Sequence, residues 1–380
     1  MGRVKEGSYR LKLSVHMLVL NGASVVERAL RPLEGIADEV VFVDTGSNDG
    51  TPALIREICN RMTVAWRCIS LHPNTHPELY FRDDASTWSF LVPGPFTGRM
   101  VLRDWSDARN RGLALCQGDY VLKMDADDEC MTPHNILPTL QLLDSNPDID
   151  YIMCPYETMC PKTAPGGEYE LETATVQDRI WRNKPSICFH HVMHEKLTGK
   201  GCLPDGRTNW LTAAMGLSFR DWRDSSGEGV RLAYRNFKVL LYEYERLVRY
   251  GEKFDSYNLY DLGREAVAAD PKFALDILLQ AMSILSPDSD LRFDCCLKIG
   301  EAYHLCGAID AAVTSYCRAV ELSPTSPSAL LRLGLLQHEM GSPEWKETLV
   351  SAMVATKRTA CFNLSFSDLK KARELLKEVR

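Results

Sequence analysis

The first part of the chain alternates between short apolar runs and amphipathic segments, and this alternation limits it to a small set of folds. Apolar runs at residues 13–20, 39–43 and 64–69 have the length and composition of buried strands. Between them, residues 23–33 and 52–61 place their apolar side chains on one helical face. Strands that alternate with helices usually pair in parallel, so the sequence predicts an α/β domain with a mainly parallel, Rossmann-like sheet.

A further apolar run, at residues 120–124, ends in four acidic side chains: Asp125, Asp127, Asp128 and Glu129. These carboxylates repel one another unless a cation neutralises them, and hard oxygen ligands of this kind suit Mg²⁺ or Mn²⁺. Ligands of open α/β sheets bind beyond the carboxyl ends of the strands, where we expect this cluster to lie. The alternative is a solvated acidic turn, because Asp-x-Asp is a frequent pattern in a chain with 51 acidic residues.

From about residue 229 onward the strand pattern disappears and long helical periodicity takes its place. Six residues stand at the offsets of a tetratricopeptide repeat, which is about 34 residues long: Gly300, Tyr303, Ala312, Tyr316, Ala319 and Pro324. Gly334 follows Gly300 by one period, and the spacing from Gly263 to Pro287 repeats the spacing from Gly300 to Pro324. We therefore expect an α/β domain over residues 1–228 and a helical tetratricopeptide-like domain over residues 229–380.

The composition argues against several classes of protein. A net charge of −7 without clustered Lys and Arg disfavours a broad nucleic-acid surface. No stretch approaches the roughly 18 consecutive apolar residues of a membrane span, and residues 1–10 are polar, so we expect a soluble cytoplasmic protein. The 13 cysteines include no Cys-x-x-Cys pair, which argues against a disulfide framework or a structural zinc site.

Five motifs stand in the order that they have in family 2 glycosyltransferases. Four are residues 18–21 (LVLN), 43–51 (VDTGSNDGT), 105–110 (WSDARN) and 124–128 (MDADD); the fifth combines residues 179–183 (RIWRN) with 192–195 (VMHE). The fifth resembles the end of that domain in members that are followed by tetratricopeptide repeats. The resemblance covers nearly the whole chain and implies a GT-A fold, in which a nucleotide-diphosphate sugar lies across the strand ends.

The resemblance assigns the nucleotide of the donor to the first two motifs. Asp44 is similar to the residue that receives the nucleobase, with backbone contacts from Leu18 to Asn21 beside it. The alternative for Asp44 is a turn-forming residue that hydrogen-bonds its own backbone. Asp49, in the same turn, fits either ligand binding or a cap for the next helix.

The third and fourth motifs correspond to the diphosphate and metal positions of the family. Arg109 resembles the arginine that reaches the diphosphate, because its planar charged fork matches phosphate oxygens; the alternative is a surface pair with Asp104 or Asp107. Asp125 and Asp127 resemble the Asp-x-Asp motif that holds Mn²⁺ or Mg²⁺ against the diphosphate. A metal at this position would stabilise the negative charge that grows on the leaving oxygen.

The acceptor must lose a proton during attack, and a carboxylate near the anomeric carbon can accept it. Glu195 is the first candidate for this base, because the family brings a loop with a His-Glu pair back over the sugar, and Asp178 is the second. His194 is expected to bind the metal or to orient Glu195. The alternative is that His194 and Glu195 form an ordinary exposed pair.

Two positions depart from the pattern of the family. Many relatives carry Asn-Glu where this chain has Asn21-Gly22. Relatives also often have a His-x-Gly-Tyr segment, which corresponds here to residues 219–222 (FRDW), and Phe219 cannot bind a metal. His194 or water would then take the place of that histidine.

Residues 71–102 form an irregular stretch that we expect to be an insertion covering the site. Three aromatic residues within it either stack on sugar or base faces or pack against the domain: Trp88, Phe90 and Phe96. The helical repeats offer a concave surface for a protein partner or for a homodimer.

The motifs therefore predict a glycosyltransferase that moves a sugar from a nucleotide-diphosphate donor to an unidentified acceptor, inverting and dependent on Mn²⁺ or Mg²⁺. The acceptor is open among a saccharide, a lipid-linked glycan, a polypeptide and, disfavoured by the charge, a nucleic-acid base. The main alternative is a tetratricopeptide adaptor that has lost catalysis but keeps a nucleotide pocket; the intact Asp125, Asp127 and Arg109 count against it. A nucleotidyltransferase would normally need a basic phosphate-binding loop, and residues 45–51 contain no Lys or Arg.

Overall fold

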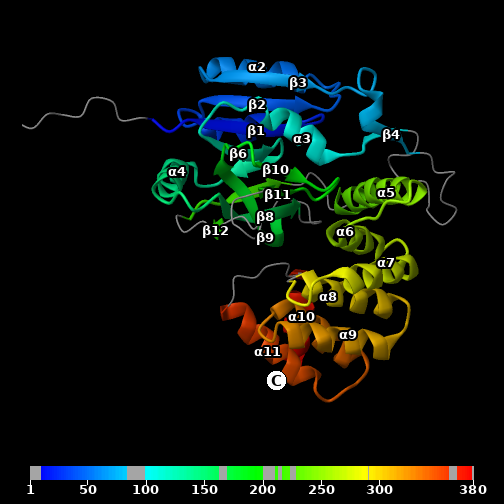
Figure 1. Cartoon of the computed structure of the whole chain (residues 1–380). Helices are drawn as coiled ribbons and strands as arrows, with labels where there is room; N and C mark the ends of the chain where they lie inside the picture. Colours follow the sequence, from blue (N-terminus) through cyan, green and yellow to red (C-terminus); the bar gives the residue numbers. More distant parts are fainter. Residues whose placement is uncertain are drawn as a thin grey trace, which may run out of the picture.

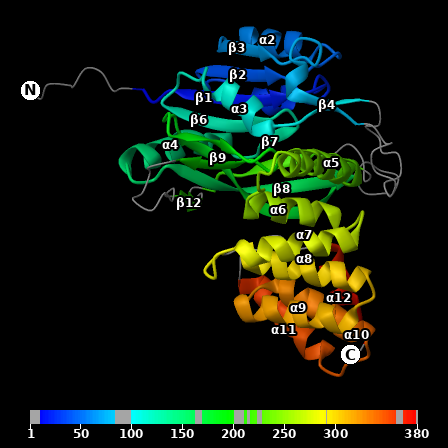
Figure 2. The ribbon, with the colours of Figure 1, turned by 45° about the vertical axis from the view of Figure 1, so that its right-hand side comes forward.

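The structure is a computed structural model and describes residues 10–83, 99–161, 169–199, 210–212, 216–222, 228–289, 291–358 and 366–378. An α/β domain is followed by a stack of helices that extends below it in the view of Figure 1. The turned view in Figure 2 shows α5 beside the sheet, with α6, α7, α8 and α9 following below it in sequence order. The predicted fold class, a mainly parallel GT-A-like sheet followed by an all-α domain, is confirmed.

The parallel part of the sheet has the strand order β3-β2-β1-β6. It consists of β1 (Leu13–Val19), β2 (Glu39–Asp44), β3 (Ala65–Ser70) and β6 (Tyr120–Asp125). Every residue of β1 and β2 is buried, which explains why both strands are almost continuously apolar. Because β1 and β6 are parallel neighbours, with Leu18 opposite Asp125, their carboxyl ends meet at one edge.

Helices cover both faces of the sheet. On one face, α1 (Val26–Leu30), α2 (Thr51–Arg61) and α4 (Ile136–Ser145) enclose the largest apolar core. On the other face, α3 (Trp105–Leu113) packs beside a hairpin of two strands. This hairpin consists of β10 (Ile187–His190) and β11 (Lys196–Gly199). One 3₁₀ turn (Arg31–Leu33) follows α1, and another (Pro133–Asn135) precedes α4.

An antiparallel extension continues the sheet beyond β6 in the order β9-β8-β13-β7. Its members are β7 (Asp128–Cys130), β8 (Tyr151–Pro161), β9 (Tyr169–Arg182) and β13 (Phe219–Trp222), and β12 (Trp210–Thr212) pairs with β8. The sequence predicted a short strand at 151–155 and a polar loop at 162–172. The loop prediction is wrong for residues 169–172, which belong to β9: the alternating sequence Tyr-Glu-Leu-Glu continues the strand and pairs with the end of β8.

The expected insertion at 71–102 is described only at its two ends. There, a 3₁₀ turn (Pro77–Leu79) leads into β4 (Tyr80–Arg82), which pairs with β5 (Met100–Leu102). The Phe81 ring stacks on Tyr242 of α5 with centroids 4.5 Å apart, and Lys238 Nζ of α5 lies 3.2 Å from Asp83 Oδ1. Trp88, Phe90 and Phe96 lie outside the described residues. The described part of this stretch therefore joins the α/β domain to the first long helix.

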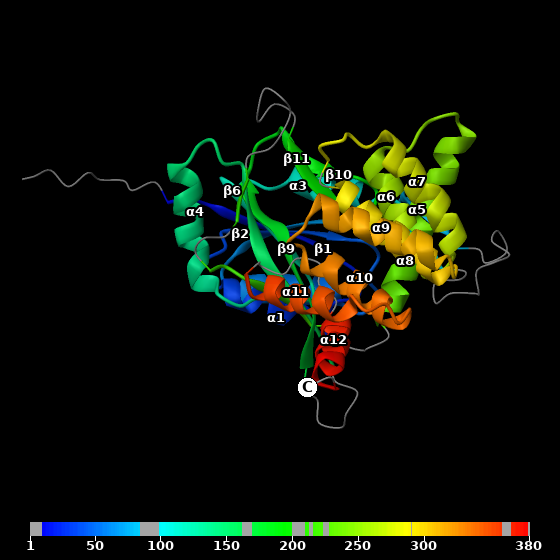
Figure 3. The same cartoon turned by 90° about the horizontal axis from the view of Figure 1, so that it is seen from below.

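The helical domain is a series of antiparallel neighbours that, seen from below, lies across from α4 (Figure 3). Its helices are α5 (Glu228–Arg249), α6 (Ser256–Ala266), α7 (Pro271–Ile284), α8 (Leu291–Leu305), α9 (Ile309–Leu322), α10 (Pro327–Glu339), α11 (Trp345–Arg358) and α12 (Phe366–Glu378). Within the described ranges, no helix has both the length and the apolar composition that crossing a membrane requires.

Three glycines repeat at the same position of successive helix pairs. Gly263, Gly300 and Gly334 lie in α6, α8 and α10, and each faces the following helix at very short range. A Cβ atom at these positions would lie 2.6 Å from the side chains of Leu278, Tyr316 and Leu349, respectively. The glycine spacing seen in the sequence thus reflects a close approach of two helices that no larger residue allows without a shift.

Candidate active site

The end of strand β6 brings an aspartate and an arginine together. Arg109 Nη2 of α3 donates a hydrogen bond to Asp125 Oδ1 at 2.7 Å. Burial alone would raise the pKa of Asp125, but the positive charge of Arg109, followed by that of Lys123, lowers it below its usual range. Asp125 is therefore held in its ionised form at the carboxyl end of the sheet.

Asp128, three residues farther on, has a structural environment. Its side chain is fully buried, and Arg179 Nη1 donates to Oδ2 at 2.5 Å while the Tyr156 hydroxyl donates to Oδ1 at 2.8 Å. The same Oδ2 accepts the backbone N–H of Asp125 at 2.7 Å. Asp128 thus fixes the turn that follows β6 and leaves little of its carboxylate for a ligand.

Asp127 differs from both of these neighbours. Its side chain is exposed, and no hydrogen bond or ion pair to another described residue holds its carboxylate. The protein around this turn removes solvation, and the negative charges of Asp128, Asp221 and Asp125 add to that effect, so the pKa of Asp127 is raised well above its usual value. Among the residues that the structure describes, no basic side chain pairs with this carboxylate.

Arg109 joins two carboxylates from different parts of the chain. Its Nη2 bonds to Asp125, its Nε donates to Glu195, and the side chain is almost fully buried. The Nη1 atom is also buried and has no hydrogen-bond partner among the described residues. The alternative of a surface pair is wrong, because Asp104 caps α3 by accepting from the Asp107 N–H, and Asp107 pairs with Arg111.

The two candidate bases lie in the same cluster as Arg109. Glu195 is 11% exposed, and although burial opposes its ionisation, Arg109 and then Lys123 lower its pKa. Asp178, on β9, has Oδ1 at 4.0 Å from Lys123 Nζ, and its buried Oδ2 lacks a hydrogen-bond partner among the described residues. Because Glu195 is largely buried and paired, the interpretation of an ordinary exposed His-Glu pair is wrong for this residue.

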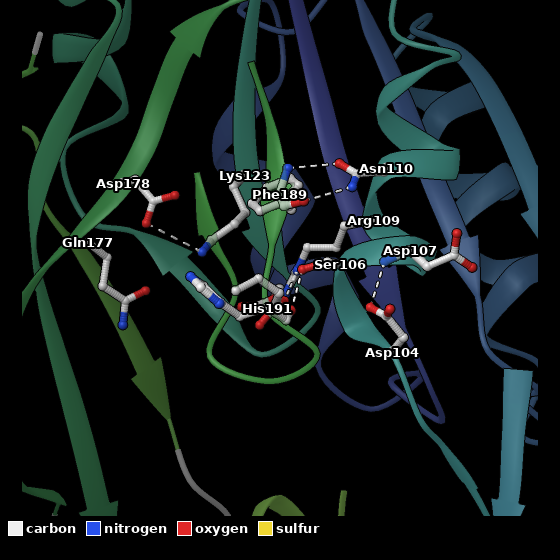
Figure 4. A network of polar contacts seen from close by, with 12 residues as sticks. Asp104, Ser106, Asp107, Arg109, Asn110, Lys123, Gln177, Asp178, Phe189 and His191 are labelled. Atoms are coloured by element: carbon white, nitrogen blue, oxygen red, sulfur yellow. Dashed lines mark hydrogen bonds and ion pairs between the residues drawn. The ribbon is translucent and has the colours of Figure 1, made fainter. Parts of the chain in front are cut away.

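Two residues of the cluster were not singled out from the sequence. Figure 4 shows Lys123 directed toward Asp178, with Phe189 and Arg109 beside it. The Lys123 ammonium lies 5.9 Å from the centre of the Phe189 ring, and the Arg109 guanidinium lies 5.7 Å from it. A lysine within an otherwise apolar strand was a signal that could have found Lys123, because buried lysines are rare without a charged partner.

His194 turns away from this cluster toward the helical domain. Its Nε2 atom lies 2.6 Å from Oε1 of Glu265 on α6. Metal binding by His194 stays a prediction, and a metal would have to compete with Glu265 for that ring nitrogen.

Two stretches of the chain match models of known protein families. Residues 101–194 match the family model for glycosyl transferase family 2, and residues 300–341 match a model for a TPR repeat. The first range contains Arg109, Asp125, Asp127, Asp178 and His194. This chain carries a family 2 glycosyltransferase domain followed by tetratricopeptide-like repeats. A role in glycosyl transfer follows in general terms.

Individual relatives are distant. A TPR repeat-containing protein of Synechococcus elongatus is 24% identical over 324 residues, which cover 83% of this chain and 67% of that protein. Among solved structures, PcrH from Pseudomonas aeruginosa is 17% identical and matches 33% of this chain and 90% of that chain, with a TM-score of 0.29. MamA is 18% identical and matches 35% of this chain and 73% of that chain, also with a TM-score of 0.29.

Two turns of the glycosyltransferase domain surround the predicted nucleobase position. Asp44 is buried and its Oδ1 accepts the Ser47 N–H at 3.0 Å, so the turn-forming bond is present. Asn21 has a φ of 52° and its Oδ1 accepts the Asn48 N–H at 2.9 Å, while Leu18 is buried. Asp49 accepts the N–H groups of Thr51 and Ala23, which ties the start of α2 to the first turn. These bonds give the edge of the sheet a fixed shape.

Gly22, one of the two departures from the family pattern, contacts the acidic turn. A Cβ atom at Gly22 would lie 2.8 Å from the Cβ of Ala126, which is shorter than two carbon atoms tolerate. The glutamate that many relatives carry would therefore push the Asp125-Ala126-Asp127 turn outward. At the second departure, Phe219 is fully buried, while the neighbouring Asp221 faces Asp127 closely enough to raise its pKa.

The residues of the glycosyltransferase domain fit a divalent cation that is shared with its substrate. Among the described residues, no group of three His, Cys, Asp or Glu side chains is arranged to hold a metal ion. Asp127, two residues after Asp125, nevertheless has a carboxylate that no basic side chain in the described ranges pairs with. One or two carboxylates completed by substrate phosphates and water are the ordinary environment of Mg²⁺ in proteins. The donor set is thus suitable for a metal that binds together with a diphosphate.

Proposed function

We propose that this protein transfers a sugar from a nucleotide-diphosphate sugar to an acceptor. The observation that carries the proposal is Arg109, whose guanidinium bridges Asp125 and Glu195 and whose Nη1 has no partner among the described residues. A buried arginine with a spare donor suits the oxygens of a diphosphate, because two N–H groups of its planar fork can bond one phosphate group.

The donor would lie along the carboxyl edge of the sheet. Asp44 and the backbone from Leu18 to Asn21 would receive the nucleobase, and Arg109 would receive the diphosphate. The hydrogen bonds that tie the turns at residues 21 and 44–51 together support this role, since a fixed edge loses little entropy when a ligand binds.

Asp125 and Asp127 would hold Mn²⁺ or Mg²⁺, with His194 as a further candidate ligand. The bound metal would supply positive charge at the leaving diphosphate. The residues themselves contribute orientation: Arg109 fixes Asp125, and the buried pair of Asp128 and Arg179 fixes the turn from which Asp127 projects.

Glu195 and Asp178 are the candidate bases for the acceptor, in that order, with inversion at the anomeric carbon as the outcome. Arg109 keeps Glu195 ionised and therefore able to accept a proton, although the same contact reduces its proton affinity. Asp178 has a free buried oxygen but pairs only at long range with Lys123. Glu195→Gln and Asp178→Asn, measured in single-turnover transfer, separate the two.

The proposal is tested with a panel of nucleotide sugars, with and without Mn²⁺. A matching donor at one hundred times its dissociation constant should raise the free energy of unfolding by about 2.7 kcal/mol and thus shift the melting temperature. Slow hydrolysis of the same donor without acceptor should depend on Mn²⁺. If no donor shifts the melting temperature and none is hydrolysed, the chain is a tetratricopeptide adaptor instead.

The rest of the chain would serve the acceptor. We propose a division into residues 1–228 and 229–380, in which the helical domain of a cytoplasmic protein presents a concave surface to the acceptor, to a protein partner or to a second copy of the chain. A saccharide, a lipid-linked glycan or a polypeptide fits this arrangement. The net charge of −7 disfavours a nucleic-acid acceptor.

A further inference from the structure

We propose that the helical domain positions the catalytic loop of the glycosyltransferase domain, and that Glu265 of α6 is the positioning residue. The loop consists of residues 191–195 and is called the His-Glu loop below. The inference rests on the proposed function, because it assigns to Glu265 an effect on sugar transfer.

The glycosyltransferase domain holds the His-Glu loop at both of its ends. At the first end, the Trp105 N–H donates to the Val192 carbonyl at 2.9 Å, and the Ser106 hydroxyl donates to the His191 carbonyl. At the second end, Glu195 accepts a hydrogen bond from Arg109. Residues 193 and 194, between these ends, have no such bond to the sheet among the contacts of the described residues.

The helical domain holds the middle of the loop. Met193 is 3% exposed and belongs to the apolar core that α5 to α8 form. His194 Nε2 lies 2.6 Å from Glu265 Oε1, and Arg264 Nη2 donates to the same oxygen at 3.0 Å. The loop thus reaches from the candidate base of one domain into the core of the other.

The start of the loop is attached to the same helix. His191 Nδ1 lies 3.7 Å from Asp255 Oδ2, at the cap of α6, and its ring stacks on Tyr257 with centroids 5.4 Å apart. A pocket of about 280 Å³ lies between this segment and helices α5 and α6. Polar contacts to α6 therefore act together with the apolar packing of Met193 in holding the loop.

The backbone of the loop needs such external contacts. His191 and His194 have φ angles of 74° and 54°, in the left-handed region that residues other than glycine rarely adopt. Conformations of this kind persist where the surroundings impose them. Contacts on both sides of the loop, from α3 and from α6, satisfy that condition.

The contact between His194 and Glu265 affects the candidate base, because His194 and Glu195 are neighbours in the sequence. Glu195 directly follows His194, so release of His194 from Glu265 lets the left-handed residue relax and moves the Glu195 carboxylate away from Arg109. A displacement of about 1 Å at a reacting group can lower a rate by about 100-fold, even when the change is made elsewhere. Arg109, which the proposed function assigns to the diphosphate, keeps its bond to Asp125, so donor binding should change much less than kcat.

The test compares Glu265→Ala and Glu265→Gln in the full-length chain. Glu265→Ala should lower kcat by about 10- to 100-fold with less than a threefold change in the KM for the donor. Glu265→Gln keeps a hydrogen-bond acceptor for the His194 ring and should recover most of kcat. Amide hydrogen exchange should become faster in residues 191–195 of Glu265→Ala and stay slow in Glu265→Gln.

The control is a second histidine-glutamate pair with no connection to the loop. His304 Nε2 lies 3.1 Å from Glu339 Oε2 within the helical domain, and Glu339→Ala should leave kcat and loop exchange unchanged. A double-mutant cycle with His194→Ala tests the route: if Glu265 acts through His194, the second substitution adds nothing to the loss of kcat.

The outcomes separate the two proposals. A wild-type chain without donor binding or turnover would overturn the proposed function. Turnover by the wild type together with full turnover and slow loop exchange in Glu265→Ala would overturn the positioning role alone. If Glu265→Ala unfolds, His194→Ala decides, because it breaks the same contact: slow amide exchange in residues 191–195 of that variant would contradict the inference.

Discussion

Two clusters of acidic and basic side chains in this molecule differ in how completely their charges are paired. One is the end of β6, with Asp125, Asp127 and Arg109. The other is a pocket of about 250 Å³ among α6, α8, α10 and α12, which is lined by acidic and basic residues in equal number. The charged residues of this pocket are Arg264, Asp294, Lys298, Glu301, Arg332 and Asp368.

In the helical pocket, the basic side chains have acidic partners close by. Lys298 lies 2.9 Å from Glu301, and Arg332 lies 3.2 Å from Asp368. At the end of β6, by contrast, Asp127 has no such partner among the described residues, and Arg109 keeps an unpaired Nη1. The number of charges therefore says little about a ligand; a charge that the fold leaves uncompensated says more.

The largest difference between the two clusters should appear when Arg109 is replaced. We expect Arg109→Ala to lower kcat/KM for the donor by about 1,000-fold, because it removes the bridge between Asp125 and Glu195 and a buried donor for phosphate. The measurement is steady-state transfer or hydrolysis. Arg111→Ala, on the same helix and in an exposed pair with Asp107, is the control. A loss below about tenfold would exclude Arg109 from diphosphate binding.

A second test concerns the balanced part of the acidic cluster. Asp128→Asn should lower the free energy of unfolding by about 3–5 kcal/mol, because it leaves the charge of the buried Arg179 uncompensated. Urea denaturation measures this change. Glu27→Gln, which removes an exposed pair with Arg61, should cost less than about 1 kcal/mol. Equal effects of the two substitutions would mean that Asp128 has no special structural role.

Replacing Asp127, the carboxylate without a basic partner among the described residues, should not destabilise the protein, in contrast to replacing Asp128. Asp127→Asn removes a carboxylate that its neighbours repel, so we expect the melting temperature of the metal-free protein to stay constant or rise. Turnover stimulated by Mn²⁺ should fall by about 100-fold, because the metal loses a ligand. The two quantities are measured on the same sample. A lower melting temperature would show that Asp127 has a stabilising partner.

The smallest expected effect lies in the helical pocket. Burial opposes the ionisation of Glu301, but Lys298 and then Arg332 lower its pKa in the folded state. A lowered folded pKa gives stability that is present above the usual value of 4.5 and is lost as the pH falls below it. Glu301→Gln should therefore flatten the acid side of the stability curve by about 1 kcal/mol or less. Parallel curves for both proteins would contradict this assignment.

The sequence was most informative where structure depends on local pattern. Apolar periodicity located β1, β2 and β6 within about one residue, since buried parallel strands need nearly continuous apolar side chains; it also located β3, although this edge strand is exposed or half-buried along its length. The glycine spacing located the repeats for a similar reason, because only glycine permits the close approach at Gly263 and Gly300. The acidic residues after β6 were visible because a strand end in an α/β sheet has a defined place.

Features that depend on distant partners could not be predicted. The pairing of β8 with β9 contains two register shifts that no local pattern reveals, and the partner of His194 lies 71 residues farther along, on α6. The same holds for Lys123, whose burial becomes understandable only once Phe189 and Asp178 are placed beside it. The different roles of Asp127 and Asp128 could not be predicted, because they depend on Arg179, which pairs with Asp128.

The two domains share more than a covalent connection. Phe81, Val101 and Met193 belong to the glycosyltransferase part of the chain, yet all three side chains are buried in the apolar core that α5 to α8 build. A chain cut after residue 228 would expose them to water and leave Asp83 without Lys238. The unit that folds and unfolds cooperatively thus extends past the boundary at which the sequence pattern changes, and the two halves of this protein cannot be separated without loss.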